Sequence, residues 1–317
     1  MNLVILVWLE WPEKCFRVNA EALNVLQSVV PADSRIIRVR TEKSFLKNLH
    51  LATHVITWHF KKQWYPLADK MVSLSTPGAG RELVDYNHAP NHVKVHFGGY
   101  HGAIIAESVV GFMFSWAHGF FRPELRKYSK PSIVWAENWP RTSIGDKCSL
   151  VAGTTAAIVG YGRIGQAIGA KLNALGVHVE GFSRKNINSF YSILGTIDWL
   201  ILALPSDTGS DNFLNAEVIS KLRRKCVVIN IGRGNAVDEE ALVKALKGNR
   251  IAGAYLDVFK NEPGPLLKGK ARENDKGILS SKNSMLPHNL IRMPHSSAFC
   301  DQYLAMCFKE LKDDGIF

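Results

Sequence analysis

The chain has 317 residues, of which 46% are hydrophobic and 21% are charged. This composition excludes a disordered chain, and the length favours two domains because single cores stop growing near about 250–300 residues. The 39 Lys and Arg residues against 28 Asp and Glu residues give a formal net charge of +11, which favours anionic partners. Because the basic residues are scattered, we expect a small anionic ligand and no nucleic acid.

The cysteines and the N-terminus point to a reducing compartment. The five cysteines are odd in number and contain no CxxC pair, so neither a disulfide framework nor a thiolate zinc site is predicted. The seven apolar residues 3–9 are too few to span a membrane. They also lack a basic flank and run into Glu10, so they do not resemble a signal peptide. We expect a cytoplasmic protein with no membrane partner and interpret residues 3–9 as a buried strand.

The first hundred residues alternate between short apolar runs and polar, helix-like stretches such as residues 20–30. This alternation predicts a parallel sheet with crossover helices. A long apolar helix is expected at about 102–121, and it is too rich in large side chains to be solvated on all sides. The expected strands lie at residues 3–9, 36–39, 54–58, 71–74 and 93–97.

A glycine motif opens the more regular second part of the chain. Gly160, Gly162 and Gly165 form a GxGxxG that follows an apolar, β-rich run and precedes a helix-like segment. In this context the glycines permit a tight turn, close backbone approach to a pyrophosphate and close helix packing, with Arg163 and Ile164 at the start of the helix. The motif therefore predicts a dinucleotide site.

The segments that follow have the spacing of a doubly wound sheet. Expected strands lie at 177–182, 199–204, 227–231 and 251–257, with helices at about 215–223 and 238–247. After the strand at 177–182, where an NAD site would place an acidic residue, the chain has Ser183, Arg184 and Lys185. A carboxylate would repel a 2′-phosphate, whereas Arg184 and Lys185 can bind one, so we expect NADP(H) to be preferred and NAD(H) to be possible. A solvated basic loop is the alternative.

Three further segments place Arg233, Glu262 and His295 just after strand-like runs, where ligands bind in open α/β sheets. Together with the glycine loop and with LALPSDTGSDNFLNAEVISKL, the segments INIGRGNAVDEEALVKAL, GAYLDVFKNEP and MPHSSA resemble the D-isomer-specific 2-hydroxyacid dehydrogenase family. The resemblance runs from about residue 106 to His295 and is closest to the glyoxylate and hydroxypyruvate reductases.

The resemblance implies a catalytic set and a reaction. Arg233 would bind the substrate carboxylate and polarise the keto oxygen, and His295 would protonate that oxygen while hydride is delivered from the cofactor. Glu262 would hydrogen-bond the second nitrogen of His295 and raise its pKa. Small 2-keto acids would thus become D-2-hydroxy acids. The cofactor would also contact Leu204, Pro205, Ile231 and Asp257.

The resemblance assigns a substrate role to two parts of the first lobe. Ala79 and Gly80 lie in a glycine-containing loop whose amides would bind the substrate carboxylate, although Arg81 and Glu82 depart from the family pattern there. Trp58 resembles a tryptophan that lines the pocket of the glyoxylate and hydroxypyruvate reductases, and an ordinary core role is the alternative. Histidines recur between residues 50 and 101, but no metal site is expected because Pro90 and a β-like run interrupt their helical spacing and no acidic or cysteine ligands accompany them.

We expect an α/β protein with two lobes and an active site in the cleft between them. Residues 1–101 and 296–317 would form a flavodoxin-like substrate domain, and residues 102–295 a Rossmann-type cofactor domain. The polar residues 266–279 look like an insertion. The apolar helix near 102–121 favours a homodimer, since such helices form the dimer arm in the family. The alternative function is that of the C-terminal binding proteins, which use this fold as nucleotide-sensing corepressors.

Overall fold

A computed structural model describes residues 3–121, 148–260, 262 and 286–317. The chain divides into two compact units, Met1–His101 with Phe299–Phe317 and Gly102–Ala298. Each unit is built on one parallel sheet, which confirms the predicted α/β class. The polar insertion expected at 266–279 lies outside the described residues.

The first unit contains a five-stranded parallel sheet in the order β2-β1-β3-β4-β5. This order, with the first strand next to the second and third, is that of flavodoxin-like folds and confirms the expected architecture of this unit. Each strand coincides within two residues with an apolar run of the sequence. The strands are β1 (Val4–Trp8), β2 (Arg35–Arg38), β3 (His54–Thr57), β4 (Ser73–Thr76) and β5 (Lys94–Phe97).

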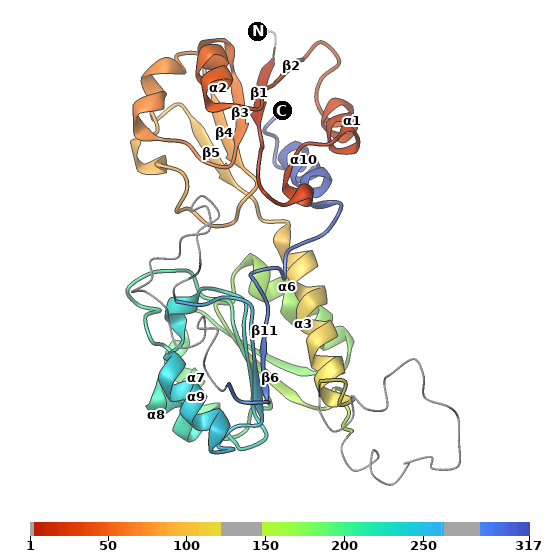
Figure 1. The fold of residues 1–317 in the computed structure, drawn as a ribbon, viewed down its shortest axis with the longest axis vertical. Helices are drawn as coiled ribbons and strands as arrows, with labels where there is room; N and C mark the ends of the chain where they lie inside the picture. The colour runs from red at the N-terminus through yellow and green to blue at the C-terminus, as the bar shows by residue number, and fades with distance from the viewer. Residues whose placement is uncertain (1–2, 122–147, 261, 263–285) are drawn as a thin grey trace, which may run out of the picture. The chain divides into compact units, whose positions relative to one another are not determined.

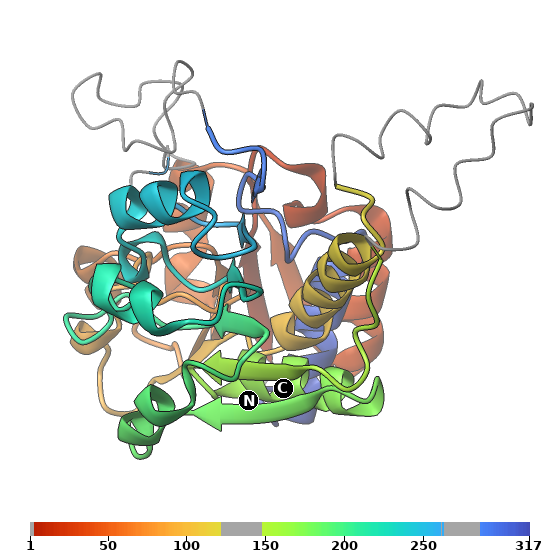
Figure 2. The same cartoon turned by 90° about the horizontal axis from the view of Figure 1, so that it is seen from below.

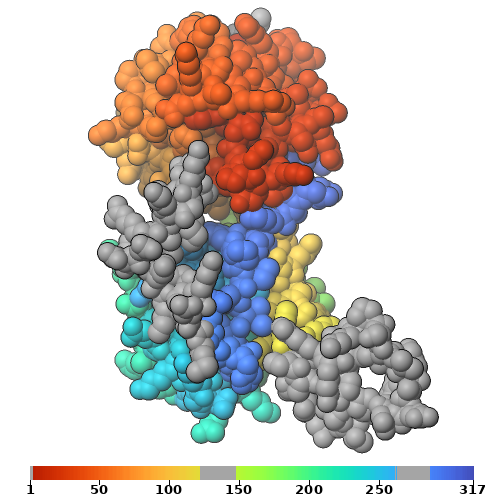
Figure 3. All heavy atoms as spheres, viewed as in Figure 1, coloured from red at the N-terminus to blue at the C-terminus, as the bar shows by residue number. Residues whose placement is uncertain are grey.

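Helices cover both faces of this sheet (Figure 1). Helix α1 (Ala20–Val29) begins at Asn19, whose side chain accepts a hydrogen bond from the amide of Ala22 at 2.7 Å. The chain crosses from β1 to β2 in one direction along the sheet and returns from β2 to β3 in the other, through α2 (Glu42–Asn48). Because such connections are right-handed, α1 and α2 lie on opposite faces. The C-terminal helix α10 (Tyr303–Asp313) packs against α1, and Figure 3 shows the C-terminal residues in blue beside the red N-terminal residues.

The second unit contains a six-stranded parallel sheet in the order β11-β10-β9-β8-β6-β7. Strand β7 is the edge strand, and the short helix α7 (Ile187–Ile193) leads from it directly to β8. Within the described residues the sheet therefore lacks the outermost strand of the 3-2-1-4-5-6 dinucleotide-binding order. The strands are β6 (Thr155–Val159), β7 (His178–Phe182), β8 (Trp199–Leu202), β9 (Val227–Asn230), β10 (Gly253–Leu256) and β11 (Leu290–Arg292).

Alternate side chains of this sheet pack into two hydrophobic clusters, one on each face. Ala156 and Ile158 of β6 point toward α3 (His101–Ala117) and α6 (Arg163–Ala174). Ala157 and Val159 point toward α7, α8 (Ala216–Lys221) and α9 (Glu239–Lys247). Figure 2 shows these helices on the two sides of the sheet. Burial on both faces explains why the central strands β8, β9 and β10 are buried along their whole length, whereas the edge strand β7 alternates with exposed polar residues.

The apolar sequence near residues 102–121 forms the predicted helix, α3, which ends at Ala117. One side of α3 is buried against the sheet through Ala106, Val109 and Met113, each fully inaccessible to solvent. Packing within the unit therefore accounts for part of the apolar character that suggested a subunit contact. None of the described helices is long and apolar enough to cross a membrane.

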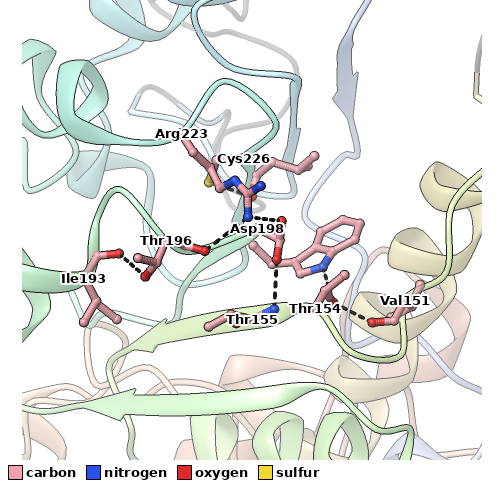
Figure 4. Close-up of polar contacts among 10 residues, drawn as sticks. Val151, Thr154, Thr155, Ile193, Thr196, Asp198, Arg223 and Cys226 are labelled. Atoms are coloured by element: carbon pink, nitrogen blue, oxygen red, sulfur yellow. Dashed lines mark hydrogen bonds and ion pairs between the residues drawn. The ribbon is translucent and has the colours of Figure 1, made fainter.

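A polar network at the amino-terminal edge of the second sheet connects the start of β6 to the residues that precede β8 and β9 (Figure 4). Asp198, just before β8, accepts a hydrogen bond from the amide of Thr155 at 3.0 Å and pairs with the Arg223 guanidinium at 2.9 Å. Arg223 also donates to the carbonyl of Thr196 at 3.3 Å. Arg223, one of four basic residues within 221–225, is thus part of the fold and lies at the amino-terminal ends of the strands.

Candidate active site

The carboxyl ends of the second unit's strands bring most of the predicted site residues to one edge. All six strands are parallel, so the residues that follow them share that edge. Ligands bind at this edge in open α/β sheets. Gly160 follows β6, Ser183 follows β7, Leu204 follows β8, Ile231 and Arg233 follow β9, Asp257 follows β10 and His295 follows β11.

The glycine loop has the backbone geometry that its motif predicts. Gly160 has φ +95°, and a Cβ there would lie 2.5 Å from the carbonyl oxygen of Ala203. A Cβ on Gly165 would lie 2.5 Å from the carbonyl oxygen of Gly160, so this glycine allows α6 to pack closely on the turn. A Cβ on Gly162, in contrast, would meet nothing within 4 Å. The space beside Gly162 is therefore open to a ligand.

Helix α6 begins immediately after this open position, with Gly162 as its N-cap residue. Its first amides are unpaired within the helix and carry partial positive charge, which suits the pyrophosphate of a dinucleotide. Arg163 is exposed, whereas Ile164 packs against the core under the sheet. The loop and the helix end therefore fit the predicted cofactor, which Gly160, Gly162 and the first turn of α6 would hold.

The residues after β7 form a compact, exposed turn. The Asn186 side chain accepts hydrogen bonds from the amide of Ser183 at 2.7 Å and from its hydroxyl at 3.2 Å, and donates to the carbonyl of Gly181 at 3.0 Å. Arg184 and Lys185 are exposed on this turn, and residues 183–186 include no acidic side chain. The turn thus fixes the backbone while both basic side chains remain accessible to a phosphate.

The resemblance implied a hydrogen bond between Glu262 and His295, and the structure contains it. The distance between His295 Nδ1 and Glu262 Oε2 is 2.7 Å. This hydrogen bond is the main cause that raises the pKa of His295, with Asp257 acting in the same direction, while burial and the nearby Arg233 lower it. The side chain of His295 remains 54% exposed. Since Nδ1 is bonded to Glu262, Nε2 is the nitrogen that can give a proton to a ligand.

Close backbone contact brings the loops of Arg233 and Glu262 together. A Cβ on Gly234 would lie 1.9 Å from the carbonyl carbon of Phe259, so only glycine permits this approach. The amide of Phe259 donates to Glu262 Oε1 at 2.8 Å, and the amide of Lys260 donates to Glu239 at 3.0 Å. Glu262 is therefore held by its own loop through Oε1, the oxygen that does not contact His295.

Arg233 lies at the turn between β9 and a short 3-10 helix, Gly234–Ala236. Its Nη1 donates to the carbonyl of Gly232 at 2.9 Å, and its own carbonyl accepts from Asn230 at 3.0 Å. A Cβ on Gly232 would lie 2.6 Å from the amide nitrogen of Leu204, so the ends of β8 and β9 are in close contact. Leu204 is partly buried, Pro205 is exposed and Ile231 is buried.

His295 adopts an unusual backbone conformation, with φ +53°. Few residues other than glycine adopt this left-handed region, so the loop needs external support. Asp257, which is 2% exposed, accepts hydrogen bonds from the amides of Ser296 at 2.8 Å and Ser297 at 3.0 Å. Its carbonyl accepts from the amide of His295 at 2.9 Å. The sequence predicted Asp257 as a cofactor ligand and gave no sign of these contacts, which join residues 38 to 40 positions apart.

The predicted substrate residues Trp58, Ala79 and Gly80 belong to the first unit, after its adjacent parallel strands β3 and β4. Trp58 is 6% exposed, and its indole donates to the carbonyl of Phe16 at 3.2 Å. Ala79 is exposed and Gly80 is half-buried. The Thr76 hydroxyl donates to the carbonyl of Trp58 at 3.4 Å and thereby connects the two loops. Among the described residues, no group of three or more His, Cys, Asp or Glu is arranged to hold a metal ion.

The chain is similar to known proteins in sequence and in fold. Residues 127–296 match the family model described as D-isomer specific 2-hydroxyacid dehydrogenase, NAD binding domain. The chain is 36% identical over 148 residues to a glyoxylate reductase of Thermococcus kodakarensis, a match that covers 43% of each protein. It is 33% identical over 167 residues to a glycerate dehydrogenase of Methylorubrum extorquens, covering 52% of this chain and 49% of that protein.

The matched segments thus span about half the length of these curated relatives. A solved structure of a family protein from Aeromonas salmonicida superposes with a TM-score of 0.72 at 21% identity and covers 99% of this chain and 96% of that one. The family match includes more than half of the chain, and the glycine loop and the strand ends described above lie within it. The chain therefore belongs to the D-isomer-specific 2-hydroxyacid dehydrogenase family.

Proposed function

We propose that the chain reduces small 2-keto acids, of the glyoxylate or hydroxypyruvate type, to D-2-hydroxy acids and that it prefers NADPH as the reductant. The single observation that carries this proposal is the His295–Glu262 hydrogen bond of 2.7 Å at the edge of the sheet that also contains the glycine loop. A proton donor with a raised pKa beside a dinucleotide site is what reduction of a carbonyl requires.

The residues of the chain have distinct roles in this reaction. A bound dinucleotide supplies the hydride that reduces the keto carbon. Arg233 binds the substrate carboxylate and polarises the keto oxygen, because a planar guanidinium offers two parallel donors. His295, protonated on both nitrogens, transfers the Nε2 proton to that oxygen as the hydroxyl forms, and Glu262 stabilises the imidazolium beforehand. We assign the backbone amides of Ala79 and Gly80 to the substrate carboxylate and Trp58 to the substrate pocket.

The preference for NADPH rests on the turn after β7. A 2′-phosphate near Ser183 would meet the exposed Arg184 and Lys185 and no carboxylate within residues 183–186. Hydrogen bonds between a guanidinium and a phosphate are among the strongest that a protein surface offers. The same turn leaves a ribose 2′-hydroxyl without the acidic partner that NAD sites provide.

The test is the loss of absorbance at 340 nm with NADPH and with NADH against glyoxylate, hydroxypyruvate, pyruvate and phenylpyruvate, for the wild type and Arg184→Ala. The variant should show a KM for NADPH raised roughly tenfold, as the loss of a charged hydrogen bond implies, and an unchanged KM for NADH. Arg224→Ala, an exposed arginine at the opposite edge of the sheet, is the control. Tight NADPH binding without turnover of any keto acid would instead support a nucleotide-sensing function.

A further inference from the structure

Ser297 connects the loop that carries His295 to three other parts of the second unit. The residue is 3% exposed. Its amide donates to Asp257 at 3.0 Å, and its carbonyl accepts a hydrogen bond from the Ser108 hydroxyl at 2.8 Å. Its own hydroxyl lies 3.1 Å from the phenol oxygen of Tyr255. Ser297 lies two residues after His295, and each of its polar groups has a partner.

Two of these partners, Tyr255 and Ser108, lie on regular elements of the unit. Tyr255 is in β10 and is 6% exposed, and its ring packs against Phe112 of α3 with the ring centroids 4.6 Å apart. Burial raises the pKa of Tyr255, so its phenol stays protonated near neutral pH and is able to donate. Ser108 lies on α3, four residues before Phe112. The loop is therefore joined to one strand by the buried hydroxyls of Ser297 and Tyr255, and to one helix by the half-buried hydroxyl of Ser108.

His295 needs this support because of its backbone conformation. A non-glycine residue in the left-handed region, here with φ +53°, is less stable than in an ordinary conformation, and it persists only where its surroundings impose it. If the Ser297 contacts were lost, the loop could relax toward an ordinary conformation. The imidazole would then turn away from Glu262, and its hydrogen bond of 2.7 Å would weaken.

We propose that Tyr255 and Ser108 are positioning residues for the proton donor, acting through Ser297 to hold His295 against Glu262. The proposal rests on the catalytic role proposed above for His295. It assigns a function to a buried phenol that touches neither substrate nor cofactor in the proposed reaction. Asp257 accepts hydrogen bonds from the amides of Ser296 and Ser297. Tyr255 contacts the Ser297 hydroxyl, and Ser108 donates a hydrogen bond to the Ser297 carbonyl.

The test is Tyr255→Phe, which keeps the ring against Phe112 and removes only the hydroxyl. We expect kcat for keto-acid reduction to fall roughly tenfold, since small displacements of a reacting group are costly, while KM for NADPH stays unchanged. The alkaline limb of the pH profile of kcat should move to lower pH, because a weaker bond to Glu262 raises the pKa of His295 less. Ser297→Ala should give the same shift, and the double variant should add little to either.

The controls are Tyr191→Phe and Ser220→Ala, which remove exposed hydroxyls on α7 and α8. Titration of the His295 imidazole by NMR measures the same pKa without any turnover, so it separates this proposal from the proposed function. An unchanged His295 pKa in Tyr255→Phe overturns the positioning role even if the wild type reduces keto acids. If Tyr255→Phe fails to fold, Ser108→Ala is titrated in its place, and an unchanged pKa there has the same meaning.

Discussion

At the scale of single residues, the pKa of His295 decides in which pH range the proposed reaction has its proton donor. Its hydrogen bond to Glu262 is the first cause of the raised pKa, and the charge of Glu262 acts in the same direction. Reduction needs the imidazolium, so its rate falls as the pH rises through this raised pKa. Oxidation of the hydroxy acid needs the neutral imidazole and therefore has the opposite dependence.

Glu262→Gln tests this assignment. The oxygen of the new side chain can still accept a hydrogen bond from the amide of Phe259, which in the wild type is 2.8 Å from Glu262 Oε1. The side-chain NH2 group then points an N–H toward His295 Nδ1. Without the carboxylate the pKa of His295 falls, so the alkaline limb of kcat for reduction should move to lower pH and the rise in oxidation should begin at lower pH. The measurement is the pH profile of kcat in both directions.

Glu217→Gln provides the matched control, because Glu217 is an exposed helix residue paired only with Lys221 at 2.7 Å among the contacts described for it. Its profile should match the wild type. The role of Glu262 as the group that stabilises the imidazolium would be contradicted if the Glu262→Gln profile moved to higher pH, for reduction or for oxidation, or did not move at all.

The sequence brought forward the members of the proposed catalytic set but little of the structure that supports them. Arg233, Glu262 and His295 were identifiable because each follows a strand-like run in a motif of its own. The contacts of Asp257, Ser297, Tyr255 and Ser108 join residues far apart in the chain, and a serine or tyrosine beside an apolar run carries no local signal of its partner. The left-handed conformation of His295 was equally invisible, since even histidine, which is enriched in this region, adopts it uncommonly.

At the scale of elements, the apolar runs predicted the strands well because parallel strands are buried on both faces. The strand expected at 227–231 is β9 at Val227–Asn230, and the helix expected at 238–247 is α9 at Glu239–Lys247, begun by the Asp238 side chain. Strand β11 was not predicted, because Leu290–Arg292 is only three residues long and only its first two side chains are partly buried against the core. The seven residues of α7 were also missed, since a helix this short has little periodicity.

The close packing of α6 on the glycine turn gives a test of the cofactor site. In Gly165→Ala the new Cβ would lie 2.5 Å from the carbonyl oxygen of Gly160, so the helix must move away from the turn that it completes. We expect the Kd for NADPH and the Kd for NADH to rise together by roughly tenfold or more, since both share the pyrophosphate, and the Tm to fall. Fluorescence titration and thermal unfolding measure the two effects.

Gly111→Ala is the matched control for this change. Gly111 lies inside α3, where a Cβ would meet nothing within 4 Å. Alanine there should stabilise the protein by about 0.5–1 kcal/mol through helix propensity and leave both Kd values unchanged. Equal Kd values for Gly165→Ala and the wild type would show that the start of α6 does not bind the pyrophosphate.

At the scale of the whole molecule, the chain consists of two units that each have a core of their own. The first unit packs Phe45, Phe60 and Leu74 into one cluster, and the second fills both faces of its sheet with separate clusters. Units with independent cores can open independently. A ligand that binds one of them should therefore slow the exchange of amides in that unit more than in the other.

Hydrogen exchange followed by mass spectrometry tests this expectation with NADPH alone. At a concentration of one hundred times Kd, the cofactor stabilises the state that binds it by about 2.7 kcal/mol, which slows exchange through opening of that state by about a hundredfold. We expect this slowing in peptides that contain β6, β8 and β9, and little change in peptides that contain β1 and β3. Gly165→Ala at the same NADPH concentration is the control, because its weaker binding should reduce the protection of β6 in proportion. Equal protection in both units would mean that they open as one, and protection confined to the first unit would place the cofactor away from the Gly160 loop.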